Sequence, residues 1–202
     1  MKFASKGFTL IELMVTLTVA AILTTLVVPN LRDFMRNSRL SGGVNDLLHS
    51  LNVARTEAIK RQNGNVVVCG STAPAAAKPV CTYDTFSGWI VFADTNSNWQ
   101  HDNGEPVLEV HATLDTSVTV KPDANSDAVS YAPTGFANLA GAAAVFPTTT
   151  LVFCDKRGVV ANGTLSTARA LYVSRTGRSR SSNLNADIVT NALPKVVGGA
   201  CP

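Results

Sequence analysis

The strongest pattern along the chain is an uninterrupted apolar run near its N-terminus. From residue 8 to residue 28 the only ionisable side chain is Glu12. As an α-helix this segment spans about 31 Å, enough to cross the hydrocarbon core of a bilayer. Lys2 and Lys6 precede the run, which predicts a cytoplasmic N-terminus and an exported remainder. No small-x-small cleavage site follows, so we expect the helix to be retained in the membrane and not removed as a secretory signal.

The apolar spacing then changes to that of an amphipathic helix. The apolar positions that recur at helical intervals are Leu40, Val44, Leu47, Leu48, Leu51, Ala54 and Ala58. We expect this stripe to lie on a sheet. Pro29 is predicted to interrupt the helix, Gly42-Gly43 is a second weak point, and Gly64 is a plausible stop.

Short β-like runs separated by turn-rich stretches occupy the rest of the chain. They cover residues 66–69, 88–92, 107–111, 117–120, 150–154 and 168–174. Residues 73–79 and 141–150 are interpreted as small-residue loops, and no motif fixes the structure of residues 122–146. The pattern predicts an α+β fold in which one long helix packs on one antiparallel sheet. We expect a leader at 1–7, a transmembrane helix at 8–28, an amphipathic helix at 29–63 and a β-rich head at 64–202.

Charge is unevenly distributed along the chain. Lys and Arg number 8 against 4 Asp and Glu in residues 1–63, 2 against 8 in residues 64–149, and 7 against 2 in residues 150–202. The middle is therefore net −6 and the C-terminal quarter net +5. This asymmetry favours a polyanion or an acidic partner at one end of the molecule.

The four cysteines lack the spacing of a redox motif or a zinc site. An even number outside the cytoplasm predicts two disulfides, for which three pairings exist. We favour Cys69–Cys81, which closes a short loop, and Cys154–Cys201, which ties down the C-terminus. Four free buried thiols are the alternative.

The position of Glu12 calls for a partner. A carboxylate inside a membrane costs about 2.5–3.5 kcal/mol, and no basic side chain lies within the apolar run. An α-amino group created by cleavage between Gly7 and Phe8 would be close enough. The alternative is a plain anchor that tolerates a glutamate.

The stretch KGFTLIELMVTLTVAAIL resembles the class III leader and N-terminal helix of type IV pilins and type II secretion pseudopilins. The resemblance implies that a prepilin peptidase cuts after Gly7 and N-methylates Phe8. It also implies that Glu12 pairs with the new amine during filament assembly. The protein would then be a single-pass inner-membrane protein with a periplasmic head, incorporated in a pilus or pseudopilus with other major and minor pilins or pseudopilins.

Three further stretches, LNVARTEAIKRQNGNVVVC, GWIVFADTN and ALYVSRTGRSR, resemble the FimT/GspH branch of minor pilins and pseudopilins. The last contains Gly177-Arg178-Ser179-Arg180. In an extended segment residues two apart face the same side about 6.6 Å apart, so Arg178 and Arg180 would present two guanidinium groups to phosphates. The supporting residues of the predicted patch are Gly177, for a tight turn, and the cations Arg175, Lys156 and Arg157.

This motif resembles the Gly-Arg-x-Arg motif of FimT-type minor pilins, which act as DNA receptors in natural transformation. The resemblance implies double-stranded DNA as a partner, bound without sequence preference and with strong salt dependence. The alternatives are a solvated loop and a surface that pairs with the acidic middle region.

A polar segment after the second β-like run echoes an EF-hand calcium loop. Its oxygen ligands would be Asp94, Asn96, Asn98, Asp102 and Glu105. Trp99, however, stands where that loop needs glycine, and its neighbours look like strands. A polar hairpin is the favoured interpretation, and a calcium site is the alternative. Apart from this calcium alternative, we expect no metal and no cofactor.

Enzymatic chemistry has little support. His49, His101 and His111 stand apart and join no nucleophile signature, and no phosphate-binding glycine loop occurs. We therefore expect that the protein is not an enzyme. The functions to separate are a DNA-binding minor pilin, a structural minor pilin that primes assembly, and a pseudopilin of type II secretion.

Overall fold

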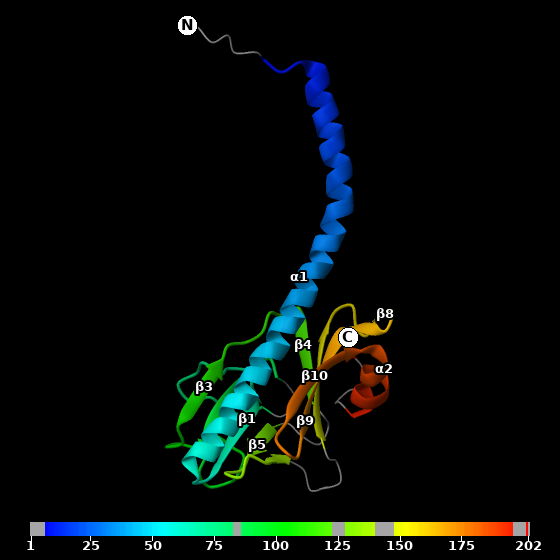
Figure 1. Cartoon of the computed structure of the whole chain (residues 1–202). Coiled ribbons are helices and arrows are strands. Elements are labelled where there is room, and N and C mark those ends of the chain that lie inside the picture. The colour runs from blue at the N-terminus through cyan, green and yellow to red at the C-terminus, as the bar shows by residue number, and fades with distance from the viewer. Residues whose placement is uncertain (1–6, 83–85, 123–127, 140–147, 196–200, 202) are drawn as a thin grey trace. The chain divides into compact units, whose positions relative to one another are not determined.

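The computed structural model describes residues 7–82, 86–122, 128–139, 148–195 and 201. These residues divide into two compact units, Met1–Ser38 and Arg39–Pro202, which we call the stem and the head. One helix, α1 (Leu10–Arg61), contributes to both (Figure 1). The helix is continuous through Pro29 and Gly42-Gly43, so the predicted interruption is wrong. A proline removes one donor without preventing the turns on either side from forming, and in apolar segments such prolines are tolerated.

From Leu10 onward the stem is part of α1, and its described large apolar side chains between Leu10 and Val28 are all exposed. Its N-terminus is capped by Thr9, whose hydroxyl accepts the N–H of Glu12 at 3.3 Å, in the Thr-x-x-Glu pattern of a capping box. Its most apolar 18-residue window has a mean hydropathy of 2.2, and none of it is buried. The hydroxyls of four threonines donate to the carbonyls three residues earlier, namely Thr16, Thr18, Thr24 and Thr25. By length and composition this helix suits a bilayer, which offers no other partners to such hydroxyls.

The head contains two antiparallel sheets where the sequence predicted one. The first sheet has the order β3-β2-β1-β5-β6. Its strands are β1 (Asn65–Ser71), β2 (Gly88–Asp94), β3 (Val107–His111), β5 (Ala128–Tyr131) and β6 (Ala137–Leu139). The second has the order β10-β9-β7-β4, with β8 paired to β9. Its strands are β4 (Val118–Pro122), β7 (Thr148–Asp155), β8 (Ala161–Asn162), β9 (Leu165–Ser174) and β10 (Ser179–Leu184).

All six predicted strands are present. Four further strands were not predicted: β5 and β6 extend the first sheet, and β8 and β10 extend the second. β5 and β6 are four and three residues long, and they fall in the segment 122–146 that carried no motif. β10 has the polar sequence SRSSNL, which shows no apolar alternation. Residues 148–150, interpreted as loop, belong to β7. The rest of the predicted loop 141–150 lies outside the described residues.

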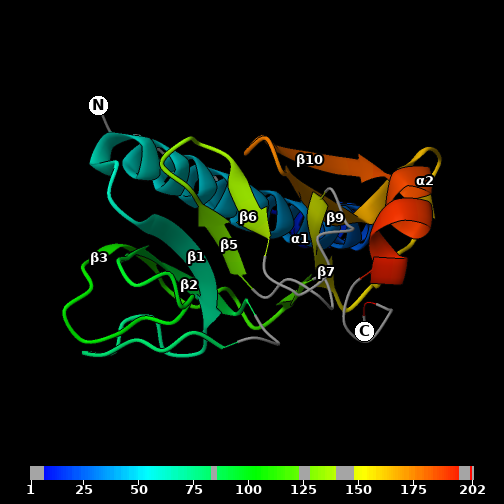
Figure 2. The same cartoon turned by 90° about the horizontal axis from the view of Figure 1, so that it is seen from below.

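The helix α1 joins the two sheets into one core. Its predicted apolar stripe is buried from Leu40 to Ala58, with Leu48 partly buried, against side chains of both sheets. Figure 2 shows this part of α1 lying across strands of both sheets. The helix ends at Arg61, three residues before the predicted stop, where Gln62 takes a left-handed conformation (φ 51°).

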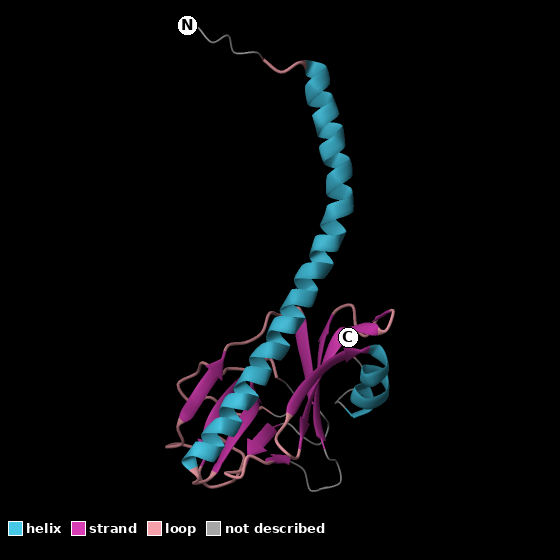
Figure 3. Cartoon of the chain, in the orientation of Figure 1, coloured by secondary structure: helices cyan, strands magenta, loops and turns pink. Residues whose placement is uncertain are grey.

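Each sheet has a second buried face. On the first sheet a cluster around Cys69, Phe92 and Ile90 lies under the loop that carries Cys81. On the second sheet Ala170 and Tyr172 pack with Ile188, Ala192 and Leu193 of the C-terminal segment. This segment comprises the helical elements α2 (Asn185–Asp187), η1 (Ile188–Ala192) and η2 (Leu193–Lys195) (Figure 3).

Both favoured disulfides, Cys69–Cys81 and Cys154–Cys201, are formed. The three apolar clusters and both disulfides lie entirely within residues 39–202, so the head has a complete core of its own.

Candidate nucleic-acid interface

The Gly-Arg-Ser-Arg motif lies at the tip of the β9–β10 hairpin. Ser174 donates its N–H to the carbonyl of Arg178 at 2.9 Å, and Gly177 donates to the carbonyl of Ser174 at 2.8 Å. Gly177 has φ +77°, the left-handed conformation required at the end of a three-residue hairpin loop. The tight turn predicted at Gly177 is therefore present.

Arg178 and Arg180 are on the same side of the hairpin. Arg180 is opposite Tyr172 in the strand register, and Arg178 closes the loop opposite Ser174. Both arginines line one cavity of about 360 Å³, together with Tyr172, Ser174, Thr176 and Ser179. Arg178 and Arg180 thus both contribute to one concave surface.

Arg180 is held in place by neighbours that sequence reasoning did not foresee. Its guanidinium carbon lies 4.2 Å from the centroid of the Tyr172 ring, and its Nη1 is 3.5 Å from Oδ2 of Asp187. Burial raises the pKa of Tyr172 to about 12. Burial alone would raise the pKa of Asp187, but hydrogen bonds from Asn191 and Ser182 and the charge of Arg180 keep it below its usual range. Arg180 is therefore oriented, and Asp187 offsets part of its charge.

Arg175 and Arg178 are exposed, as is Arg180, but in the described part of the head they lack the contacts that hold Arg180. Among the described residues, no ion pair is found for either side chain. The backbone at Arg175 is fixed, because its carbonyl accepts the N–H of Ala137 at 2.9 Å. These two guanidinium groups are available to an anion in solution.

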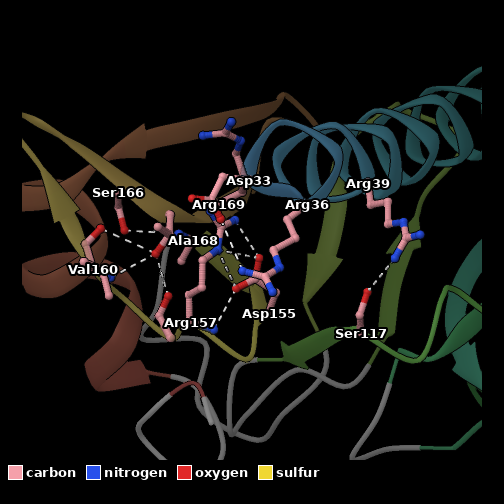
Figure 4. A network of polar contacts seen from close by, with 12 residues as sticks. Asp33, Arg36, Arg39, Ser117, Asp155, Arg157, Val160, Ser166, Ala168 and Arg169 are labelled. Atoms are coloured by element: carbon pink, nitrogen blue, oxygen red, sulfur yellow. Dashed lines mark hydrogen bonds and ion pairs between the residues drawn. The ribbon is translucent and has the colours of Figure 1, made fainter. Parts of the chain in front are cut away.

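Lys156 and Arg157 do not join this surface, which corrects the predicted patch. They follow β7 in the turn 155–158, whereas the tip lies beside the start of β7, because Thr148 pairs with Ser174. About seven strand residues separate the two ends, roughly 23 Å. Arg157 is also occupied: its Nη2 is 2.6 Å from Oδ2 of Asp155, whose carboxylate it contacts through Nε as well (Figure 4).

The described acidic residues of the middle region are paired elsewhere than at the tip or lie away from it. Asp115 pairs with Arg39 at 3.4 Å, while Arg39 also contacts Ser117 (Figure 4). Glu109 accepts the hydroxyl of Ser50 at 2.7 Å. In residues 86–122, the described portion of this region, no acidic side chain reaches Arg175 or Arg178. The alternative of a tip paired with this region gains no support.

The calcium-like loop uses its own oxygens to hold itself together. The carboxylate of Asp94 accepts the backbone N–H groups of residues 98 and 99, and that of Glu105 accepts those of residues 95 and 102. Asp102 accepts the side-chain amides of Asn96 and Asn98 at 2.9 and 2.7 Å. These bonds, that of Asn96 first, lower the pKa of Asp102.

Trp99 takes the left-handed conformation (φ 70°) at the position where an EF-hand loop has glycine. No group of three His, Cys, Asp or Glu side chains able to hold a metal ion occurs in the part of the chain that the structure describes. We interpret the segment as a hydrogen-bonded loop between β2 and β3.

The three histidines lie on different elements of the head. His49 is exposed on α1, His101 bridges the carbonyls of Pro79 and Glu105, and His111 stacks on Trp89 with ring centroids 3.8 Å apart. Within the described residues, no hydrogen bond joins any of the three rings to a serine, threonine or cysteine side chain.

Comparisons with known proteins identify the family of this chain. Residues 43–177 match the family described as Type II transport protein GspH, and residues 2–28 match the prokaryotic N-terminal methylation motif. The first match covers well over half of the chain, which therefore belongs to the GspH family. Comparison with curated proteins finds no match.

Two solved structures are similar to this chain. The type IV minor pilin FimU of Pseudomonas aeruginosa strain PAO1 is similar with a TM-score of 0.51 and 17% identity, over 74% of this chain and 92% of that one. The minor pseudopilin EpsH of the Vibrio cholerae type 2 secretion system has a TM-score of 0.46 and 10% identity, over 72% and 97%. The FimU likeness confirms the pilin-like α+β fold, with a long N-terminal helix and an antiparallel head.

The family and the methylation motif together define the coarse role, that of a minor pilin or pseudopilin of a type IV pilus or a type II secretion system. Members of this family are structural components that associate with other pilins or pseudopilins. The motif and the apolar helix fit a membrane-anchored subunit of the filament.

Proposed function

We propose that the protein is a minor pilin that binds DNA through the tip of the β9–β10 hairpin and serves DNA uptake in natural transformation. The observation that carries this proposal is the convergence of Arg178 and Arg180 on one cavity, with Arg175 exposed beside it on the same turn. Guanidinium groups on a fixed turn suit the oxygens of a phosphate backbone, and they read no base sequence.

The stem supplies anchoring and assembly in this proposal. A prepilin peptidase of the inner membrane cuts between Gly7 and Phe8 and methylates the new N-terminus, and the head lies in the periplasm. Glu12 then pairs with the amine of Phe8. Before cleavage, no hydrogen bond or ion pair to the Glu12 carboxylate is found among the described residues, which is consistent with a partner that processing creates. The filament position we propose is near the tip, where the head is free to meet DNA.

The strength and salt dependence of DNA binding follow from the number of cations. If the three arginines each neutralise one phosphate, the logarithm of the affinity falls with the logarithm of salt with a slope of about −2.7. Between about 50 and 200 mM salt the affinity would fall about 40-fold. Arg178 contributes more than Arg180, because Asp187 already offsets part of the charge of Arg180.

A second candidate function is that of a GspH-type pseudopilin in type II secretion, since the matching family is described by that role. In that case the basic tip contacts a protein, either another pseudopilin or a secreted substrate. A third, a structural minor pilin that primes pilus assembly, shares the anchor and the processing site with the other two.

The experiment that separates these functions is the double substitution Arg178→Ala, Arg180→Ala in the native host. The proposal predicts that DNA uptake falls while pili still assemble and secretion continues. Loss of piliation together with uptake would make the arginines structural. Loss of secretion in a strain without pili would favour the pseudopilin. Lys156→Ala is the matched control, because it removes a cation from the far end of the same sheet.

A further inference from the structure

A single guanidinium group links the basic tip to the rest of the head. Arg55 lies on α1, and its Nε donates to the carbonyl of Gly135 at 3.1 Å. Its Nη2 donates to the carbonyl of Thr176, also at 3.1 Å. Gly135 belongs to the turn between β5 and β6 in the first sheet, whereas Thr176 is in the tip of the second. Arg55 therefore bridges the two sheets at the candidate interface.

The two turns are packed against each other with no room to spare. A Cβ placed on Gly177 would collide with the carbonyl oxygen of Gly135 and would lie 3.0 Å from Nε of Arg55. A Cβ on Gly135 would lie 3.4 Å from the same nitrogen. Both glycines have positive φ. The N–H of Ala137 donates to the carbonyl of Arg175 and closes the contact from the other side.

This chemistry needs an arginine. The planar guanidinium presents several N–H donors in a fixed fork, and here two of them meet carbonyls of two different turns. A lysine has the same charge, but its ammonium is a compact point on a flexible stem and does not reproduce both bonds in the same geometry. Arg55 is half-buried, and its Nε and Nη2 are used inside the protein.

We infer that Arg55 is the positioning residue of the DNA-binding tip: it fixes the turn from which Arg175 and Arg178 project, and it does not itself contact phosphate. This inference rests on the proposed function. Its physical basis is that a turn held in one conformation loses less freedom when it binds than a mobile one. Releasing the turn therefore weakens binding without removing a contact to DNA.

The test compares Arg55→Lys with Arg61→Gln in the soluble head, residues 37–202, titrated with a short labelled DNA duplex at low salt. Arg55→Lys keeps the net charge, and we expect its affinity to fall about three- to tenfold, as ordering of one or two side chains costs on that scale. Arg61→Gln loses a charge from the same helix, where Arg61 pairs with Glu57, and we expect less than a twofold change.

A double-substitution cycle separates positioning from direct contact. In an Arg178→Ala head, we expect Arg55→Lys to have little further effect, because the released turn no longer carries its main cation. Effects that add in full would mean that Arg55 acts independently of the tip and would overturn the inference. Wild-type affinity in Arg55→Lys would overturn it as well.

Amide hydrogen exchange tests the clamp without DNA. We expect the Ala137 and Gly177 amides to exchange faster in Arg55→Lys, whereas the amides of β1 keep wild-type protection and show that the head is folded. Unchanged exchange at both amides refutes the clamp itself. A wild-type head that binds no DNA refutes the proposed function even if the exchange result holds, so the two failures are distinguishable.

Discussion

Substitution of Gly177 by alanine should destabilise the head far more than its place in an exposed hairpin suggests. Two costs add. An L-residue in the left-handed conformation costs about 1–2 kcal/mol relative to glycine. The new methyl group would also collide with the carbonyl oxygen of Gly135, which is backbone and cannot rotate away. Either this strain remains, or the tip separates from Gly135 and the two hydrogen bonds of Arg55 are lost.

Both routes lead to a similar magnitude. Hydrogen bonds from a charged donor contribute about 1.5–3 kcal/mol each, although the half-exposed position of Arg55 reduces this. We expect Gly177→Ala to lower the free energy of unfolding by about 3 kcal/mol in total, a fall in Tm of roughly 6–12 °C for a domain of this size. The measurement is thermal and urea unfolding of the soluble head.

The matched control is Gly163→Ala. Gly163 also has a positive φ, +63°, in the turn between β8 and β9, but a Cβ there would meet nothing within 4 Å. It should therefore show the backbone cost alone, about 1 kcal/mol and 2–4 °C. If the two variants unfold at the same temperature, the contact between the tip and Gly135 does not constrain the protein, and the reasoning about the clamp is refuted.

Three further outcomes follow from other parts of the head. Ser50→Ala should lower the free energy of unfolding by about 2–4 kcal/mol, because it removes the hydrogen-bond partner of both Trp89 Nε1 (2.9 Å) and Glu109 (2.7 Å). Thr56→Ala removes an exposed hydroxyl from the same helix and should change the urea midpoint little. Replacing Cys154 and Cys201 by alanine should lower the free energy of unfolding by about 4 kcal/mol, and replacing Cys69 and Cys81 by about 3 kcal/mol, because the two disulfides close loops of 47 and 12 residues. An inverted order of the urea midpoints would contradict this chain-entropy argument. Because the pKa of Tyr172 is raised in the folded state, the tyrosine ionises first in the unfolded state as the pH rises. Its contribution to the free energy of unfolding is therefore present below pH 10 and is lost as the pH rises from 10 to about 12. Tyr172→Phe should reduce this alkaline loss of stability, and identical alkaline unfolding profiles of variant and wild type would exclude Tyr172 as its source.

The parts of the fold that the sequence predicted were those with strong periodicity. The apolar stripe from Leu40 to Ala58 and the six β-branched runs each carry a local signal, and each became a buried helix face or a strand. β5, β6 and β10 carry none, because they are short or polar and are held in place by their neighbours in the sheet. Four strands were not predicted, and nothing in the sequence of the six predicted ones divides β1, β2 and β3 from β4, β7 and β9 into two sheets.

The site was predicted in its parts and not in its environment. Local spacing identified Gly177, Arg178 and Arg180. Lys156 and Arg157 were grouped with them because they share the basic character of the C-terminal quarter, but charge content does not tell at which end of a strand a turn lies. The partners that orient the tip are distant in sequence: Arg55 is 121 residues from Thr176. Tyr172 had a usable signal, since its neighbours Leu171 and Val173 face the core and alternation directs it to the opposite face.

The most direct test of the central claim is the binding of duplex DNA to the soluble head at several salt concentrations. The account predicts dissociation constants in the micromolar range at low salt, and a fall in affinity of about 40-fold between about 50 and 200 mM salt. It also predicts near-complete loss of binding in Arg178→Ala with Arg180→Ala, and retention in Lys156→Ala. A folded head that ignores DNA at low salt, or one whose binding survives the double substitution, would contradict the account and turn the basic tip into a surface for protein.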